Sequence, residues 1–331
     1  MDLDAFRALE PWCWRAPSAH NTQPWRLRYE PDAVRIGWDP AYTLPAADPT
    51  GRDLRLSLGA FVETCLIVAA DAGLRLEYLA DHDERHRWVG LLRPAPHRYP
   101  TPFRTTDVWE RRTHRGTLAG GVEPDVLAAL DAVARPAGGG GVRTVPRADR
   151  LGALLRAADR GSYADPAVVA ELRRWLRLDP THPDYHADGL TDRCLALSRP
   201  AAAGLRVALA GYPLLRPLGL PRLLAAAGGD PLAHGGTVLV LLAPEHLDRS
   251  GQVEFGRVLL RSWLTLHTAG LAAHPLSQLI DVAATRAALG TLLDVAPQRL
   301  LHVTRVGRPT RPAPRSARRV PACAAAPPTG S

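Results

Sequence analysis

Hydrophobic and polar positions alternate with a period of two near the start of the chain. In residues 25–29 and again in 34–38, apolar side chains occupy every second position, and Pro31 and Asp32 lie between the two runs. Alternation of this kind, interrupted by residues that favour turns, predicts a β-hairpin with one buried face. We therefore expect residues 25–38 to form two paired strands.

A second pattern follows, in which apolar residues face nearly all directions. The later part of residues 48–74 is too long for a strand and stops at Gly73, which is typical of a buried helix that ends at glycine. The same reasoning predicts helices at 3–13, near 123–134, 147–160 and 166–177, at 252–269 and near 282–294, and strands at 74–80, 86–93, 237–244 and 299–306. Residues 179–236 show no clear period, and the chain after Gly307 is expected to be an extended tail.

Two of the predicted helices share a sequence pattern. Residues 59–74, GAFVETCLIVAADAGL, and residues 256–271, GRVLLRSWLTLHTAGL, both begin with Gly and end with Ala-Gly-Leu, at a constant offset of 197 residues (256 minus 59). Chance similarity between two apolar helices is one interpretation, and a duplicated unit is the other. The duplicated unit predicts that each long helix lies at the centre of its own half of the chain.

Composition excludes some classes of protein. Hydrophobic residues make up 46% and charged residues 22% of the 331 residues, which is typical of a globular protein with a substantial core. The net charge is +8, but all 41 basic residues are Arg, and abundant Ala, Gly and Pro indicate GC-rich codons. The charge alone therefore does not indicate nucleic acid. The N-terminus has no signal-like apolar run, and later apolar stretches are broken by Arg and Pro. We expect no membrane partner, no metal site and a cytoplasmic protein.

One polar motif lies just before the hairpin. Residues 16–25 read APSAHNTQPW and place His20, Asn21 and Gln23 in one loop. Each of these side chains can both donate and accept hydrogen bonds, which is more than a turn requires. The loop is therefore a candidate binding element.

A second motif, ERRTHRG at residues 110–116, surrounds Thr113 with arginines. Arginine forks match phosphate oxygens in a planar, bidentate way, and a threonine hydroxyl adds one short donor. A solvated basic turn is the alternative interpretation of this motif alone.

Together the two motifs resemble the nitroreductase-like FMN flavoprotein family. The match is closest to its Acg-like branch, in which one chain carries two nitroreductase-like halves, and DPTGRDLRLSLGA, AGLAAHPLSQ and RVGRPTRPAPRSARR fit that branch in the same order. The resemblance implies an α+β fold, a nitroreductase-like sandwich of mixed sheet and helices, duplicated as an intrachain pseudo-dimer. Its halves would be residues 1–100 and 101–331. The first half holds only the Pro-Ser loop and the second only RRTHR, which implies one intact FMN site and one degenerate site.

The resemblance also implies which residues bind the cofactor. They are Arg111, Arg112, Thr113, Arg115, Pro17, Ser18, His20, Asn21, Gln23, Leu276, Ser277, Arg318 and Arg319. The RRTHR residues would hold the FMN phosphate, and residues 17–23 and 276–277 would face the flavin ring, with Gln23 nearby or fixing the loop. Residues 318–319 would close over the phosphate, although a disordered basic tail is the alternative for that pair. The role of His20 stays open.

The implied function is an FMN-dependent oxidoreductase that transfers hydride between a nicotinamide cofactor or organic substrate and a small acceptor. That acceptor would be a nitro compound, a quinone, a conjugated alkene or a biosynthetic intermediate. NAD(P)H would be a transient reductant, and no catalytic side chain is required because the flavin carries the chemistry. The alternative is an FMN-sequestering protein shielded by a lid at 179–236, and an Arg-rich nucleic-acid binder is a third interpretation. The only partner expected is a small-molecule substrate. We expect a monomer with an internal pseudo-two-fold axis, which leaves room for a further homodimer.

Overall fold

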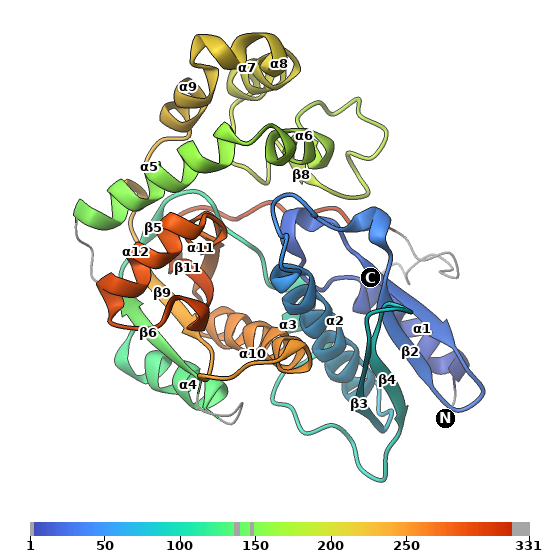
Figure 1. Cartoon of the computed structure of the whole chain (residues 1–331). Helices are drawn as coiled ribbons and strands as arrows, with labels where there is room; N and C mark the ends of the chain where they lie inside the picture. The colour runs from blue at the N-terminus through green and yellow to red at the C-terminus, as the bar shows by residue number, and fades with distance from the viewer. Residues whose placement is uncertain (1–2, 136–139, 146–148, 320–331) are drawn as a thin grey trace.

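The fold contains two antiparallel sheets with two long helices between them (Figure 1). The computed structural model describes residues 3–135, 140–145 and 149–319. Its helices are α1 (Leu3–Cys13), α2 (Arg52–Asp71), α3 (Thr105–Glu110), α4 (Pro124–Ala134), α5 (Asp149–Ala164), α6 (Pro166–Trp175), α7 (Arg199–Ala210), α8 (Tyr212–Leu215), α9 (Leu220–Ala227), α10 (Arg249–Thr268), α11 (Gln278–Asp281) and α12 (Ala283–Leu293). Its strands are β1 (Trp25–Tyr29), β2 (Val34–Trp38), β3 (Leu76–Asp83), β4 (Trp88–Pro94), β5 (Leu118–Ala119), β6 (Gly141–Val145), β7 (Leu176–Arg177), β8 (Leu190–Thr191), β9 (Thr237–Leu242), β10 (Ala272–Pro275) and β11 (Leu300–Pro309). The α+β class predicted from the sequence is confirmed.

The first sheet has the strand order β1-β2-β4-β3, and neighbouring strands are antiparallel. The predicted hairpin forms, with Leu27 opposite Ile36. Val34 and Ile36 are fully buried in one cluster with Phe61 of α2 and Phe6 of α1. The alternation in the sequence therefore identified the face of this sheet that packs on α2.

The second sheet has the order β10-β11-β9-β6, with β5 beside β11. Along the four-strand path of each sheet, two strands precede a long helix in the sequence and two follow it: β1, β2, α2, β3, β4 for the first sheet and β6, β9, α10, β10, β11 for the second. The order in space is also the same in both sheets, with the fourth strand between the second and the third. This correspondence supports the internal duplication expected from the sequence, which stays a proposal.

Helices α2 and α10 approach closely at two glycines. A Cβ atom added at Gly59 would lie 1.9 Å from the carbonyl oxygen of Val253, and one added at Gly256 would lie 2.3 Å from the carbonyl oxygen of Leu56. Leu56 and Val253 are 197 residues apart, as are Gly59 and Gly256, so the two contacts mirror each other. Only residues without a side chain allow the helix backbones to meet here.

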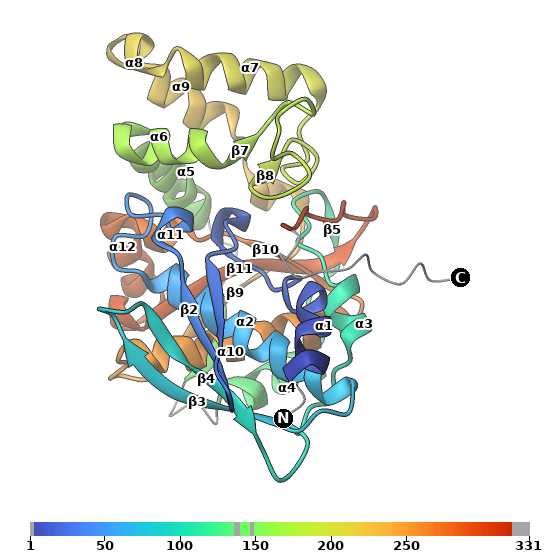
Figure 2. The same cartoon turned by 90° about the vertical axis from the view of Figure 1, so that its right-hand side faces the viewer.

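An additional helical layer is inserted between β6 and β9. It comprises α5 to α9 and the short parallel pair of β7 and β8, and it lies above both sheets in Figures 1 and 2, with α7, α8 and α9 outermost. Its core includes Val169, Leu209, Tyr212 and Leu224. Within the described ranges, no helix has the length and apolar character needed to cross a membrane.

Several elements differ from the sequence-based expectations. The elements α3, β5, β6 and β10 were not predicted. Strand β5 has two residues and β10 has four, and β6, GVRTV, does not alternate between apolar and polar side chains. Strand β11 continues past Gly307 to Pro309, where it pairs with β5, so the extended segment begins later than expected. In the segment without a clear period, Pro200, Pro213 and Pro221 stand in the first turns of helices, a position that suits proline.

Candidate functional site

The loop before β1 has an unusual backbone. His20, Asn21 and Gln23 have φ angles of 47°, 55° and 54°, in the left-handed region that non-glycine residues seldom adopt. The Ser18 hydroxyl oxygen accepts a hydrogen bond from the Gln23 N–H at 2.9 Å. The Ala19 N–H donates to Ser57 Oγ on α2 at 3.2 Å. These bonds hold the loop against the beginning of α2.

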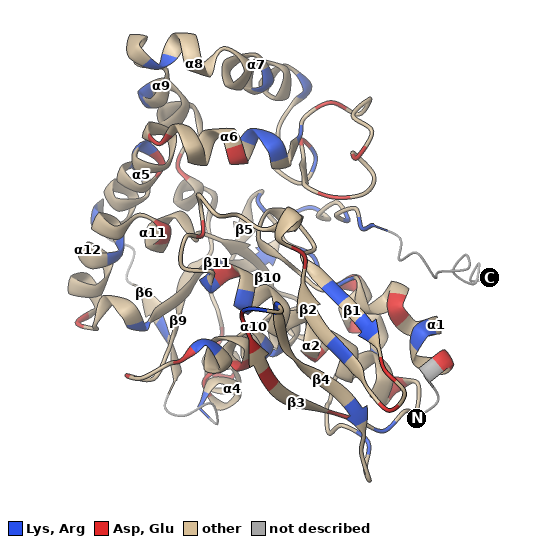
Figure 3. Cartoon of the chain, turned by 45° about the vertical axis from the view of Figure 1, so that its right-hand side comes forward, with Lys and Arg blue, Asp and Glu red and all other residues tan. Residues whose placement is uncertain are grey.

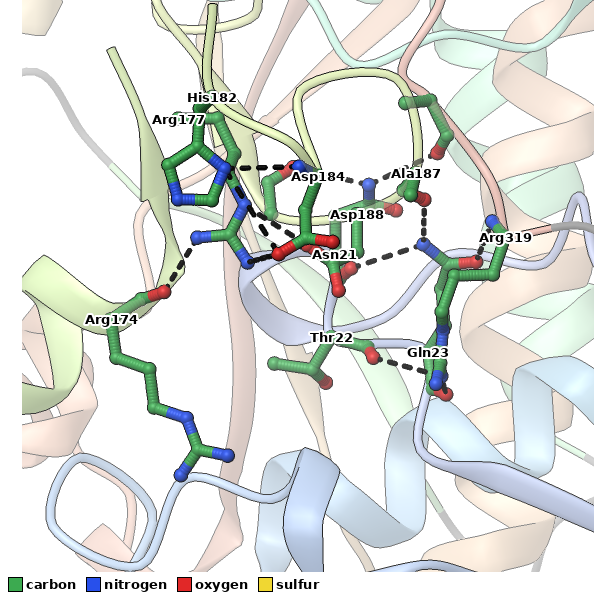
Figure 4. A network of polar contacts seen from close by, with 12 residues as sticks. Asn21, Thr22, Gln23, Arg174, Arg177, His182, Asp184, Ala187, Asp188 and Arg319 are labelled. Carbon is green, nitrogen blue, oxygen red and sulfur yellow. Dashed lines mark hydrogen bonds and ion pairs between the residues drawn. The ribbon is translucent and has the colours of Figure 1, made fainter. Parts of the chain in front are cut away.

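The amide side chains of this loop bind other segments of the chain (Figure 4). Asn21 Nδ2 donates to the carbonyl oxygens of Gly189 and Ala317, each at 3.1 Å. Gln23 Nε2 donates to the carbonyl oxygen of Ala187 at 2.9 Å. The loop therefore joins the helical insertion to the C-terminal segment.

Arg318 completes this network from the C-terminal side. Its Nη1 donates to Asn21 Oδ1 at 2.8 Å, and its Nη2 donates to the carbonyl oxygens of Arg15 at 3.1 Å and Ala16 at 3.0 Å. Burial and the nearby charge of Arg15 hold its pKa well below the usual range. Arg318 thus lies at the predicted site, but its guanidinium hydrogens are donated to the loop and to the residues just before it.

The RRTHR segment follows α3 and is attached to the second sheet. Thr113 pairs with Ala273 of β10 through a parallel bridge, and the His114 N–H donates to the Ala273 carbonyl at 3.0 Å. The guanidinium carbon of Arg111 lies 5.2 Å from the ring centre of Trp263 on α10. Backbone pairing therefore places the segment, and an aromatic ring positions its first arginine.

The arginines of this region carry charge that no carboxylate offsets. Among the described residues, no ion pair forms at Arg15, Arg111, Arg112 or Arg115, and Arg112 and Arg115 donate to backbone carbonyl oxygens at 2.7 Å and 2.9 Å. Burial and neighbouring arginines lower the pKa of Arg15 and of Arg111 to about 10, so both stay protonated at neutral pH. A group of this kind fits an anion.

A cavity of about 1000 Å³ lies where these segments meet. The predicted cofactor-binding residues that line it are Pro17, Ser18, His20, Asn21, Arg111, Arg112, Thr113, Arg115, Ser277 and Arg318. Small-molecule pockets range from about 300 to 1000 Å³, so this one has room for a large cofactor.

Three predicted residues lie outside the cavity lining. Gln23 is fully buried and fixes the loop. Leu276 is also fully buried, in the core of the second sheet, and its N–H donates to the Val303 carbonyl at 2.8 Å. The Arg319 guanidinium lies 3.6 Å from the ring centre of Tyr42. The structure therefore does not bring Leu276 or Arg319 to the cavity, because core packing and aromatic stacking hold them elsewhere.

One end of the cavity is acidic, which the sequence motifs did not indicate. Arg52 Nη2 donates to Asp53 Oδ1 at 2.7 Å and to Asp281, and Asp48 lies beside this group. All three aspartates line the cavity. Burial, followed by repulsion from Asp53, raises the pKa of Asp48 and of Asp281 well above the usual range. The stretch DPTGRDLR contains three of these residues, but only the packing of α11 on α2 brings them together with Asp281.

Two histidines with unpaired ring nitrogens also line the cavity. Burial lowers the pKa of His20 and of His302 to about 4, so both rings are neutral at pH 7. In the part of the chain that the structure describes, His20 Nδ1 and His302 Nε2 are buried without a hydrogen-bond partner. The cavity therefore offers a basic end, an acidic end and two neutral polar rings, a donor set that fits a ligand with an anionic group and a polar ring system.

The chain is similar in sequence to curated proteins that are named as nitroreductases. It is 28% identical over 310 residues to the Mycobacterium tuberculosis protein named "Putative NAD(P)H nitroreductase Rv3131". The aligned region covers 91% of this chain and 85% of that relative. It is 25% identical over 352 residues to "Putative NAD(P)H nitroreductase acg" of the same species, and the aligned region covers 96% of this chain and 93% of that relative. No family model matches the sequence.

Solved structures with similarity are more distant. The FMN and NADPH-dependent nitroreductase NfnB from sphigopyxis sp. strain HMH is 18% identical, with a TM-score of 0.36, over 64% of this chain and 94% of that chain. The FMN-dependent nitroreductase NfnB from Mycobacterium smegmatis is 19% identical, with a TM-score of 0.31, over 61% of this chain and 86% of that chain.

Proposed function

We propose that the cavity binds FMN and that the chain is an FMN-dependent oxidoreductase, which uses NAD(P)H to reduce a small acceptor. The observation that carries this proposal is Arg111, a buried guanidinium on Trp263 without a carboxylate partner among the described residues. An uncompensated buried charge is costly, and a phosphate group would offset that cost. The names of the two Mycobacterium tuberculosis relatives support the same class of reaction.

The phosphate would be held by Arg111, Arg112, Thr113 and Arg115, which line one region of the cavity. Each charge-assisted hydrogen bond contributes about 1.5–3 kcal/mol. Three or four of them supply roughly half of the −12 kcal/mol that corresponds to nanomolar affinity. Burial of a flat ring in the rest of the cavity would supply the remainder.

The ring would be faced by Pro17, Ser18, His20 and Ser277. Bound there, FMN would supply two-electron hydride chemistry, which no side chain provides. Ser18 Oγ already accepts from a backbone N–H, so its own hydroxyl proton is free to donate. His20 is neutral and can donate from one ring nitrogen and accept at the other. Arg15, next to this loop in the sequence, also lines the cavity, and its fixed positive charge would favour a reduction that adds negative charge to the ring.

Flavin content tests the proposal. Arg111→Ala and Thr113→Ala should each weaken FMN binding by about tenfold or more. Each removes a charge-assisted hydrogen bond of at least about 1.5 kcal/mol, and about 1.4 kcal/mol already corresponds to tenfold in affinity. Arg93→Ala, which removes an exposed arginine paired with Glu77, is the matched control. FMN per chain is measured from the visible spectrum, with circular dichroism as a check on folding. Full flavin content in both site variants, or wild-type protein that cannot be reconstituted with FMN, would contradict the assignment.

A second function is favoured by the helical insertion. Its residues Tyr163, Leu172, Leu190 and Leu197 line the same cavity, which supports a covered cofactor and thus a protein that sequesters FMN. The expected lid at 179–236 contributes lining residues from its two ends, 190–197 and 228–234, and none of the described lining residues comes from 199–227. Anaerobic addition of NADPH distinguishes the two functions. If the protein is an oxidoreductase, NADPH should bleach the flavin. If it sequesters FMN, only dithionite should bleach it.

The internal duplication bears on stoichiometry. We propose that residues 1–100 supply the ring-facing loop and residues 101–331 supply the phosphate-binding arginines, so that the two halves complete one site. The repeated strand order supports this arrangement. The expected result is one FMN per chain in a monomer, measured by flavin release and light scattering. Two FMN per chain would overturn it.

A further inference from the structure

Exposed large hydrophobic residues are concentrated in one short segment of the described chain. They are Val207 (68% exposed), Leu214 (80%), Leu215 (40%), Leu218 (79%) and Leu223 (65%). All five lie on α7, α8, α9 and the turn between α8 and α9, and we call them the outer apolar patch. Isolated exposed leucines are common in proteins, but a cluster of this kind marks a contact surface.

These helices also have a separate buried face, so the patch is not the side on which they pack against the protein. The same segment buries Leu209, Tyr212, Leu220 and Leu224 against the rest of the insertion. Its inward positions are therefore already filled with apolar side chains, and the outer apolar residues are additional to what folding requires. Helices with apolar residues on both faces are suited to contact a second apolar environment.

The charge around the patch has one sign. Residues 194–229 contain four arginines and no Asp or Glu, and Figure 3 shows blue but no red on α7, α8 and α9. Arg206 pairs with Asp179, whereas Arg216 and Arg222 are exposed and no described acidic residue pairs with either of them. A partner for this surface therefore needs an apolar region to contact the leucines and negative charge to contact the arginines around them.

The position of the patch allows such a partner to approach. Figures 1 and 2 place α7, α8 and α9 on the outside of the molecule, beyond α5 and α6. The described cavity lining includes no residue of α7, α8 or α9. Occupation of the patch therefore leaves the cavity residues in place.

We propose that the outer apolar patch and the arginines around it bind the surface of an anionic lipid bilayer. Leucine on one side, arginine at the edge and no acidic residue are the features of segments that lie in the plane of a membrane interface. This binding needs no membrane-spanning helix. A second copy of the chain is a poorer partner, because a symmetric contact would bring Arg216 and Arg222 of each copy close to those of the other.

Co-sedimentation with lipid vesicles tests the proposal. The full chain is mixed with vesicles of phosphatidylcholine alone and of phosphatidylcholine with about 30 mol % phosphatidylglycerol. We expect binding to the anionic vesicles only, with at least a tenfold loss when the salt rises from about 0.1 M to 1 M, because salt screens surface charge. Equal sedimentation with both kinds of vesicle, or with neither, would overturn the proposal.

Surface variants identify the residues responsible. Leu214→Ser with Leu218→Ser, and separately Arg216→Glu with Arg222→Glu, should each weaken vesicle binding at least tenfold without changing the melting temperature, because these side chains are exposed. Arg75→Glu with Arg93→Glu, at exposed positions in the first sheet region, is the control for net charge and should retain binding. Loss in the control pair, or patch variants that only convert a dimer to a monomer, would show that the patch binds something other than lipid.

Discussion

The sequence predicts Asn21 as a ligand contact, but in the structure its side chain stabilises the fold. Its amide donates to Gly189 and Ala317 and accepts from Arg318, while its backbone has a φ of 55°. The side chain therefore stabilises a strained loop and leaves little capacity for a ligand. Through that loop it determines where Ser18 and His20 face the cavity.

Substitutions of Asn21 should separate the backbone from the side chain. Asn21→Gly keeps the positive φ angle without strain and loses three side-chain hydrogen bonds, so we expect a loss of roughly 2–3 kcal/mol in the free energy of unfolding. Asn21→Ala loses the same bonds and adds left-handed strain, of about 1 kcal/mol more. Urea denaturation measures both. A glycine variant as stable as the wild type would contradict the structural role of the amide.

His302 should make the protein sensitive to acid. Its pKa is about 4 in the folded chain because of burial, against about 6.5 for an ordinary histidine. Between these values the unfolded chain binds more protons, so stability rises with pH in this window and falls as pH drops through it. Wild-type protein should lose roughly 1–3 kcal/mol more than His302→Phe between pH 7 and pH 4. Parallel pH curves of the two proteins, measured by denaturation, would count against this role.

At the scale of elements, the contact of α2 with α10 depends on two glycines. The mirrored approach of Gly59 and Gly256 follows from their lack of side chains, and the matching ends of these helices in the sequence already suggested related roles. Alanine usually stabilises a helix interior relative to glycine by about 1 kcal/mol. At this crossing the added methyl group would instead force the helices apart.

Glycine substitutions therefore give opposite results in different helices. Gly59→Ala and Gly256→Ala should each destabilise the protein by about 1–3 kcal/mol, as overpacking does. Gly204→Ala in α7 is the matched control, because a Cβ there would meet nothing within 4 Å, and it should stabilise the protein by up to about 1 kcal/mol. Thermal denaturation compares the three. Similar shifts in all of them would mean that the crossing is looser than the structure shows.

At the scale of the whole molecule, a buried carboxylate joins the two long helices α2 and α10. Glu63 of α2 is fully buried and accepts hydrogen bonds from Arg257 Nε at 2.9 Å, Arg261 Nη1 at 3.1 Å and the Tyr99 hydroxyl at 2.7 Å. Both arginines lie on α10. Removal of one partner from a buried ion pair leaves the other charge uncompensated.

Glu63→Gln should therefore destabilise the entire chain. We expect a loss of about 3 kcal/mol in the free energy of unfolding, because Arg261 loses its counter-charge and Arg257 keeps only its pair with Glu254. Glu77→Gln removes the partner of Arg93 in an exposed pair and should cost no more than about 1 kcal/mol. Urea unfolding followed by fluorescence and by circular dichroism measures both variants. Equal effects of the two substitutions would show that the pair between the helices adds little to stability.

Local patterns in the sequence determined the hairpin, the two long helices and the polar loop, because side-chain periodicity reports which face of an element is buried. The arginine motif also indicated an anion-binding segment, because the guanidinium and hydroxyl donors are a property of the residue types themselves. Strand β10 has only four residues, and β6, GVRTV, lacks the alternation that identified the hairpin.

Tertiary structure alone decided how these parts meet. Asn21 bonds to residues 168 and 296 positions away, and Arg111 lies on a tryptophan of a distant helix. No local pattern encodes such pairings, because the packing of whole elements determines which donor reaches which acceptor. The acidic end of the cavity also depends on tertiary structure, because it brings together aspartates that are far apart in the sequence. The same holds for the outer apolar patch, because other apolar side chains already fill the buried face of its helices.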